Sequence, residues 1–347
     1  MFEPILSIND FAFQLGIKVG SLRDIAERVE VLYDPFDVRR DSTSKSWRHI
    51  DNPVAELKSL QTRIYKRLFA EYPFNIHVVG ALPGRSIMDN ATFHDAPPLL
   101  VTLDIAGCFP SIHDERHVFP MLRRLGFSTK VAGLLTRLTT LQNRLPQGAP
   151  TSPVIANLVL GPVHDELERI SSDLGLNWSM FVDDIAVSGM RAREAIAPVI
   201  AVLAEHGFKV SRKKLEIAGT GQRQRITGIV VNRRPTVGRA FIQTLRSGIL
   251  KASSEPEFVD AGTLASLYGK VQHVEWVNPT QGAVLRRFAE RHLPTAPAGR
   301  GTRLEPLRRG CSSFSSDHSA WQAPPEAAVA EATGQVSDEA RPIVREA

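Results

Sequence analysis

The stretch 178–187 constrains this chain most, because it sets two aspartates, Asp183 and Asp184, side by side between short β-forming runs. Apolar residues alternate before the pair and resume after it, which predicts a β-hairpin with both carboxylates at its tip. Neighbouring like charges cost energy unless a cation shares them, so the pair indicates a divalent metal site. Taken alone, such a pair is more often a solvated turn, because acidic residues favour turns.

Two earlier stretches of the chain favour the metal site over the solvated turn. The apolar run 100–103 leads directly into Asp104, an expensive place for a charge that has no ligand. The stretch 145–153 reads Leu-Pro-Gln-Gly-Ala-Pro-Thr-Ser-Pro, a proline-stiffened loop that precedes an apolar helix predicted over 154–167. An acidic strand, a rigid loop and an acidic hairpin therefore follow one another along the chain.

In this order the three segments resemble a reverse transcriptase. Gly-Arg-Ser-Ile at 84–87, Asn-Ala-x-x-His at 90–94 and Ile-Thr-Gly-Ile-Val-Val-Asn at 226–232 narrow the resemblance to the bacterial retron reverse transcriptases. The resemblance implies an α+β fold, a right-hand polymerase with fingers, a palm made of an antiparallel sheet packed on helices, and a helical thumb.

The same resemblance, read with the hydrophobic periodicity, predicts the division of the chain. We expect N-terminal helices and fingers over 1–98, a palm that carries the catalytic motifs and part of the fingers over 99–239, and a thumb over 240–293. Within the first part, periodicity predicts helix over about 8–33. From 294 to 347, Pro, Ala, Gly, Ser and Arg dominate and periodicity stops, which predicts a disordered tail.

By resemblance, the catalytic residues and the metal ligands are largely the same side chains. Catalysis is assigned to Asp104, Asp183, Asp184 and Lys214, and the binding of two Mg²⁺ ions to Asp104, Ile105, Asp183 and Asp184. Lys213 remains an alternative to Lys214, because the family's Asn and Thr beside this lysine are Ser211 and Leu215 here.

The incoming nucleotide is expected to meet a second group of residues. By resemblance, a basic fingers hairpin at 37–50 grips the triphosphate, a bulky ring excludes the 2′-hydroxyl of ribonucleotides, and the Gln-Gly loop lies under the nascent base pair. On charge alone, 37–50 is an ordinary solvated loop, and the choice between its two adjacent arginines stays open. The residues are Arg39, Arg40, Arg48, Phe109, Gln147 and Gly148.

A third group carries the expected contacts with RNA and primer. The resemblance points to two elements, the Asn-Ala-x-x-His segment with the arginine before it and the Thr-Gly turn. A lone His beside an Asn is usually a hydrogen-bonded structural residue, and only the neighbouring motifs make an RNA contact the sharper hypothesis. The residues are Arg85, Asn90, His94, Thr227 and Gly228.

Composition sets wider limits. The 347 residues carry a formal charge of +5, which is compatible with a polyanionic partner, and two distant cysteines that support neither a disulfide framework nor a cysteine metal site. An apolar run of about 18 residues and a signal peptide are both missing, so we expect a bacterial cytoplasmic protein without a membrane partner.

The resemblance implies an RNA-directed DNA polymerase that copies a structured non-coding RNA into RNA-linked single-stranded DNA (msDNA) from deoxynucleoside triphosphates. It also implies a role in antiphage defence with an effector protein. Two alternatives stay open: a non-retron bacterial reverse transcriptase, either group II intron-like or defence-associated, and a catalytically inactive RNA-binding scaffold.

Overall fold

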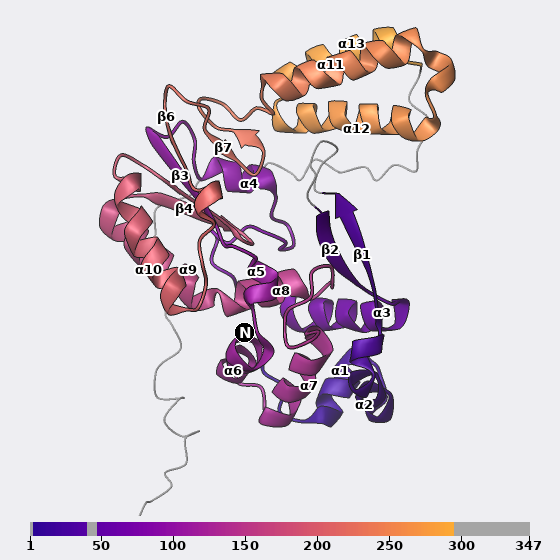
Figure 1. Cartoon of the computed structure of the whole chain (residues 1–347), viewed down its shortest axis with the longest axis vertical. Helices are drawn as coiled ribbons and strands as arrows, with labels where there is room; N and C mark the ends of the chain where they lie inside the picture. The colour runs from indigo at the N-terminus through magenta and orange to yellow at the C-terminus, as the bar shows by residue number, and fades with distance from the viewer. Residues whose placement is uncertain (1–2, 40–46, 295–347) are drawn as a thin grey trace, which may run out of the picture. The chain divides into compact units, whose positions relative to one another are not determined.

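A four-stranded antiparallel sheet forms the centre of the fold in the computed structural model, which describes residues 3–39 and 47–294 (Figure 1). Its strands lie in the order β4-β5-β3-β6. Their bounds are β3 (Leu99–Asp104), β4 (Asn177–Phe181), β5 (Asp184–Ser188) and β6 (Glu216–Gly219). The apolar sequence of β3 suits an inner strand that is paired on both edges. β4 and β5 form the predicted acidic hairpin.

The pairing register divides the sheet into two faces. Asp104 pairs with Asp184 and Thr102 with Ala186, so these side chains share one face because directly opposed residues point the same way. The alternate residues of the strands, which include Leu103 and Ile185, belong to the main hydrophobic core. Several helices contribute to that core, among them α8 (Ser152–Val159), α9 (Gly161–Leu174) and α10 (Ile196–Glu205).

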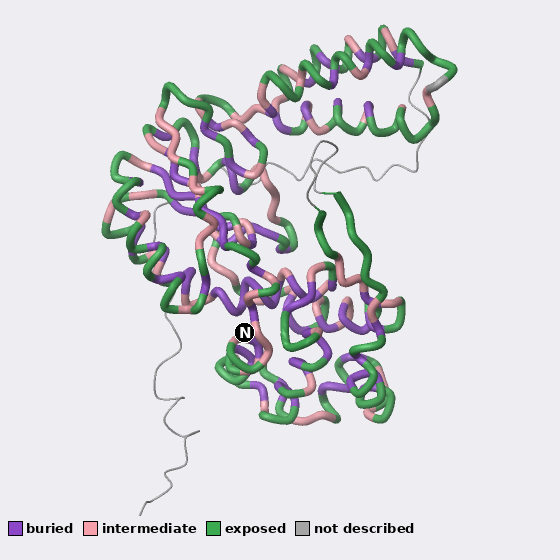
Figure 2. The backbone as a smooth tube through the Cα atoms, viewed as in Figure 1, coloured by how far each residue is buried: buried purple, intermediate pink, exposed green. Residues whose placement is uncertain are grey.

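The N-terminal part consists of short helices and one exposed β-ribbon. Gly16, at φ 62°, ends the first helix, so the stretch predicted as helix over 8–33 is divided. β1 (Tyr33–Arg39) and β2 (Trp47–Pro53) pair antiparallel, and Figure 2 shows the exposure of this ribbon in green. Helices of this part are α1 (Ile8–Leu15), α2 (Val19–Glu27), α3 (Ala55–Ile64) with a π-helical turn (Tyr65–Phe69), and α4 (Ile87–Thr92).

Between the sheet strands lie further helices, among them α5 (Cys108–Ser111), α6 (Phe119–Arg124) and α7 (Thr129–Thr139). After the sheet, a two-stranded hairpin, β7 (Arg225–Ile226) and β8 (Ile229–Val230), precedes three long helices. These are α11 (Arg239–Ser254), α12 (Ala261–Val277) and α13 (Pro279–His292), whose buried residues belong to a second hydrophobic cluster. The helical prediction for 240–293 is therefore confirmed, whereas the predicted tail lies outside the described residues, apart from Pro294.

Candidate active site

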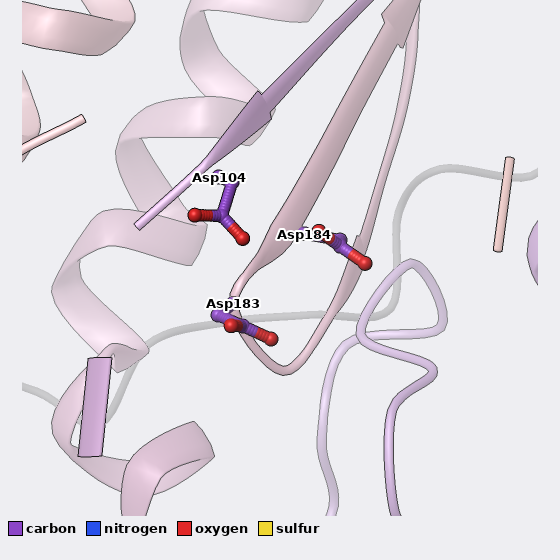
Figure 3. A group of neighbouring side chains, drawn as sticks. All are labelled: Asp104, Asp183 and Asp184. Carbon is purple, nitrogen blue, oxygen red and sulfur yellow. The ribbon is translucent and has the colours of Figure 1, made fainter. Parts of the chain in front are cut away.

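Three carboxylates meet at the end of the sheet (Figure 3). Asp104 ends β3, Asp183 lies in the hairpin turn, and Asp184 begins β5 directly opposite Asp104. One oxygen from each lies within 4.8 Å of the others. The Ile105 amide donates to the Asp183 carbonyl (2.9 Å), which ties the end of β3 to the hairpin turn. Residues 79 positions apart along the chain are therefore brought together as the sequence predicted.

The electrostatics of this cluster favour a bound cation. Burial raises the pKa of the Asp183 carboxyl, and the charge of Asp104 raises it further. Partial burial, with the charges of Asp183 and Asp104, raises the pKa of Asp184 to about 6, although this carboxyl is the most open to solvent of the three. Negative charge is disfavoured in both groups, first because burial removes the carboxylates from water and then because the neighbouring carboxylates repel it. A cluster of hard carboxylate oxygens suits a divalent ion such as Mg²⁺.

One lysine supplies part of the missing positive charge. The Lys214 Nζ donates to Asp104 Oδ2 at 2.5 Å, while Lys213 lines the same cavity without a described contact of this kind. The charge of Lys214 lowers the pKa of both other carboxyls, against the larger effects that raise it. Geometry therefore favours Lys214 over Lys213 as the lysine of the site.

The turn of the catalytic hairpin has an unusual backbone. Val182 has φ 59°, a left-handed conformation that is strained for a β-branched residue. Gly80 packs against it so closely that a Cβ there would lie 2.4 Å from the Val182 nitrogen. The amide of Val79 also donates to the Met180 carbonyl (2.8 Å). Sequence analysis missed the role of Gly80, because nothing in a Gly-Ala-Leu-Pro-Gly stretch tells which element it will meet.

The Gln-Gly loop is fastened to the β-ribbon. The Asp51 amide donates to the Gln147 carbonyl (2.8 Å), and the Gln147 amide donates to the Asp51 carboxylate (3.1 Å). Gly148, at φ 131°, leaves no room for a side chain, because a Cβ would lie 2.8 Å from Ile50 Cγ2. Asp51 was also missed, and no local signal in the sequence distinguishes it.

The other described residues assigned to the nucleotide lie on the β1–β2 ribbon and on α5. Arg48, on β2, is near enough for its charge to lower the pKa of Asp183, and Arg39 stacks over the Trp47 ring at 5.2 Å. Phe109 is half-buried in α5, beside the buried Cys108. Arg40 lies outside the described residues.

Two residues assigned to RNA are engaged inside the protein instead. His94 is 0% exposed, so its side chain is not placed to contact RNA directly, and its assignment to RNA stays a prediction. Its ring nitrogens hydrogen-bond the hydroxyls of Ser188 (2.7 Å) and Ser179 (2.8 Å). The Arg85 guanidinium donates to three backbone carbonyls, of residues 74, 75 and 78, which occupies the group expected to bind RNA. The polar side-chain atoms of His94 and Arg85 thus form hydrogen bonds within the fold.

The Thr-Gly turn joins β7 to β8. Thr227 (φ 44°) and Gly228 (φ 90°) are both left-handed, the combination that a tight two-residue hairpin requires. Asn90 is buried and its Nδ2 donates to Thr227 Oγ1 at 3.4 Å. A cavity of ≈ 370 Å³ lies between this turn and the carboxylates, and its lining includes Asp104 and Asp184.

This combination of an antiparallel sheet, a paired-aspartate hairpin and a glycine loop defines a class, the template-dependent polymerases that transfer nucleotidyl groups. The family described as reverse transcriptase (RNA-dependent DNA polymerase) matches residues 38–231. The chain belongs to this family, and the relatives described next are retron reverse transcriptases.

Three curated relatives show the extent of the similarity. Retron Mx65 reverse transcriptase of Myxococcus xanthus is 32% identical over 82% of this chain and 71% of its own length. Retron Ec86 reverse transcriptase of Escherichia coli is 25% identical over 71% of this chain and 78% of its own. Retron Se72 reverse transcriptase of Salmonella heidelberg is 33% identical over 62% of this chain and 56% of its own. Together they support a retron-type RNA-directed DNA polymerase that uses an RNA template, nucleotides and divalent metal.

Among the described residues, no helix combines the length and the hydropathy that crossing a membrane requires.

Proposed function

We propose that this polymerase copies a structured partner non-coding RNA into single-stranded DNA that stays linked to RNA, and that it works in the bacterial cytoplasm in antiphage defence with an effector protein. The observation that carries the polymerase function is the cluster of Asp104, Asp183 and Asp184 within 4.8 Å. The relatives named as retron reverse transcriptases support the copying of an RNA template. The structured partner RNA and the linked product are proposed from the resemblance to that family.

Two Mg²⁺ ions are the proposed cofactor. Asp104 and Asp183 would hold both, with Asp184 and the Ile105 backbone completing the site, since the Ile105 side chain is buried. When bound, such a pair activates the primer hydroxyl and neutralises charge on the departing pyrophosphate. The three carboxylates lie within 4.8 Å of one another, which supports this assignment. Burial and then mutual repulsion raise the pKa values of Asp183 and Asp184, and a bound cation would relieve that repulsion.

The chain's own residues would bind and orient the nucleotide. Arg48, with Arg39 or Arg40, would hold phosphate oxygens, since a guanidinium forks onto them in pairs. Gln147 and Gly148 would form the surface beneath the nascent base pair, held by Asp51. The Phe109 ring would exclude a 2′-hydroxyl.

The side of the site opposite the proposed nucleotide contacts would receive the primer. Lys214, which now contacts Asp104, would release that carboxylate to the metal ions and hold a proton near the leaving pyrophosphate. Thr227 and Gly228 would support the primer terminus across the cavity. In this scheme residues 1–98 contain the fingers, 99–239 the palm and 240–293 the thumb.

The test is co-expression of the chain with the transcript encoded next to its gene. Wild-type enzyme should yield DNA that migrates faster after ribonuclease treatment, whereas Asp183→Asn should yield none and still retain the RNA in a pull-down. Purified wild type should also extend a DNA primer on a generic RNA template in Mg²⁺.

Each result has a separate meaning. Extension on the generic template without RNA-linked DNA in cells would favour a non-retron reverse transcriptase. RNA binding without DNA synthesis in either assay would identify an RNA-binding scaffold. Unchanged synthesis by Asp183→Asn would remove the catalytic assignment.

A further inference from the structure

The Asn-Ala-x-x-His segment is a motif of the sequence that the proposed mechanism does not use. Its helix, α4, has six residues and is capped at Ser86, whose hydroxyl accepts from the Asp89 amide while the Asp89 carboxylate accepts from the Ser86 amide. A helix this short is not stable by itself, so its packing partners decide where it lies. The buried residues of α4 are Asn90 and Ala91, and the buried His94 lies two positions beyond the end of the helix. We call these three residues the α4 brace.

One end of the brace holds the catalytic hairpin. His94 bonds Ser179 on β4 and Ser188 on β5, so a single imidazole joins both strands. Register pairs Ser179 with Ala186 and Asn177 with Ser188, which places both serines on the sheet face that carries Asp184. Ser188 lies four residues from Asp184, or about 13 Å along the strand.

The other end of the brace holds the Thr-Gly hairpin. Asn90 donates to Thr227, and Ala91, which is 0% exposed, belongs to the same buried cluster as Ile226 and Ile229. α4 contacts both β7 and β8, and Figure 1 shows it beside β7. The same short segment thus contacts the two hairpins that border the ≈ 370 Å³ cavity.

We propose that the α4 brace fixes the spacing between the catalytic carboxylates and the Thr227–Gly228 turn, so that a primer terminus supported by the turn lies in line with the carboxylates. This inference rests on the proposed function. Asn90 and His94 are then positioning residues, which act through the hairpins they hold. The full burial of His94 supports this role over direct recognition of RNA.

Loss of the brace should affect chemistry rather than nucleotide binding. Without the imidazole, two buried hydroxyls lose their partner and the hairpin shifts relative to the turn. Misplacement of reacting groups by about 1 Å slows a reaction about 100-fold. Arg48 and Gln147, the proposed nucleotide contacts, lie on β2 and the loop fastened to it and should be undisturbed.

The chain provides a matched control in His164. This histidine is also buried, and it stacks on Trp178 at 6.4 Å between centroids. Trp178 and Ser179 are adjacent in β4, so their side chains point to opposite faces of the sheet. His164 stacks on Trp178 and His94 bonds Ser179, so the two histidines pack on opposite faces. Substitution of either histidine disturbs the packing around β4, but only His94 joins the strands on the face of the carboxylates.

The experiment measures single-nucleotide extension of a primed RNA template by full-length wild type, His94→Ala, His94→Gln, Asn90→Ala and His164→Ala. Rates are corrected for the folded fraction from circular dichroism. We expect kcat to fall at least 10-fold in the His94 and Asn90 variants, with KM for the nucleotide within about twofold of wild type. His164→Ala should keep kcat within about threefold. If His94→Ala does not fold, His94→Gln and Asn90→Ala carry the comparison.

A second measurement needs neither nucleotide nor metal. Amide hydrogen exchange over 177–188 and 225–230 should speed up in His94→Gln, and His164→Ala should leave 225–230 unchanged. If wild type is active but the His94 and His164 variants change kcat and hydrogen exchange equally, the proposed role of the α4 brace is overturned and the proposed function is not. A wild-type enzyme that extends no primed RNA template would overturn the proposed function and the brace with it.

Discussion

Asp183→Asn should make the metal-free protein more stable while it abolishes DNA synthesis. The three carboxylates come within 4.8 Å, and among the described residues Lys214 forms the ion pair with this cluster. Two unit charges at that distance repel by about 3.5 kcal/mol at an effective dielectric constant of about 20. Solvent screening and the Lys214 charge reduce this, so we expect the free energy of unfolding to rise by about 1–2 kcal/mol. The raised pKa of Asp183 has the same sign, because the fold disfavours its ionised form.

The assay is urea unfolding in EDTA and again in Mg²⁺. Wild type should gain stability from Mg²⁺ by mass action, whereas Asp183→Asn should gain less because one ligand is lost. Asp173→Asn is the control: Asp173 is an exposed α9 residue paired with Arg169, and its substitution should change stability by less than about 1 kcal/mol. A metal-free Asp183→Asn protein that is less stable than wild type would refute the electrostatic reasoning.

Four further changes test other parts of the structure. Phe109→Ala should let ribonucleotides compete with deoxynucleotides in primer extension, and unchanged discrimination would place the gate elsewhere. Asp51→Ala removes the carboxylate that accepts from the Gln147 amide, so KM for the nucleotide should rise about 10-fold while filter binding shows unchanged primer affinity. Gly80→Ala forces a Cβ against the catalytic hairpin and should lower the free energy of unfolding in urea by about 1–3 kcal/mol. Burial lowers the pKa of His164 to about 3, so below about pH 6.5 this histidine binds a proton in the unfolded state but not in the folded state. Between pH 7 and pH 5 the free energy of unfolding of wild type should therefore fall by about 2 kcal/mol more than that of His164→Gln in urea titrations. Equal losses in the two proteins would contradict this.

The strand and the hairpin that carry the acidic cluster could be predicted from local patterns, whereas the convergence of the three aspartates was predicted from the order of the motifs and the family resemblance. Asp104 ends an apolar strand, and Asp183 and Asp184 interrupt alternating β-formers. The strand, the hairpin and their order along the chain could therefore be predicted from the sequence. Helix boundaries were harder to predict: helical residues were expected over about 8–33, but Gly16 provides a left-handed cap that ends the first helix of this stretch.

Other features depend on partners far along the chain. Asp51 meets Gln147 96 residues away, and His94 meets Ser179 85 residues away. A buried histidine that bonds two serines and an exposed one that binds RNA look alike in sequence, because burial comes from the packing of distant elements. Arg85 illustrates the same limit, since its partners are carbonyls that every residue has.

The close approach of Gly80 to Val182 has a consequence for protein engineering. The turn that presents Asp183 is shaped partly by a loop about one hundred positions upstream, through contacts that leave no space for even a methyl group. Transplanting 177–188 into another scaffold would therefore move the carboxylates without the surface that bends their turn. A chimaera would need 77–80 as well, and libraries that vary this loop should keep position 80 as glycine.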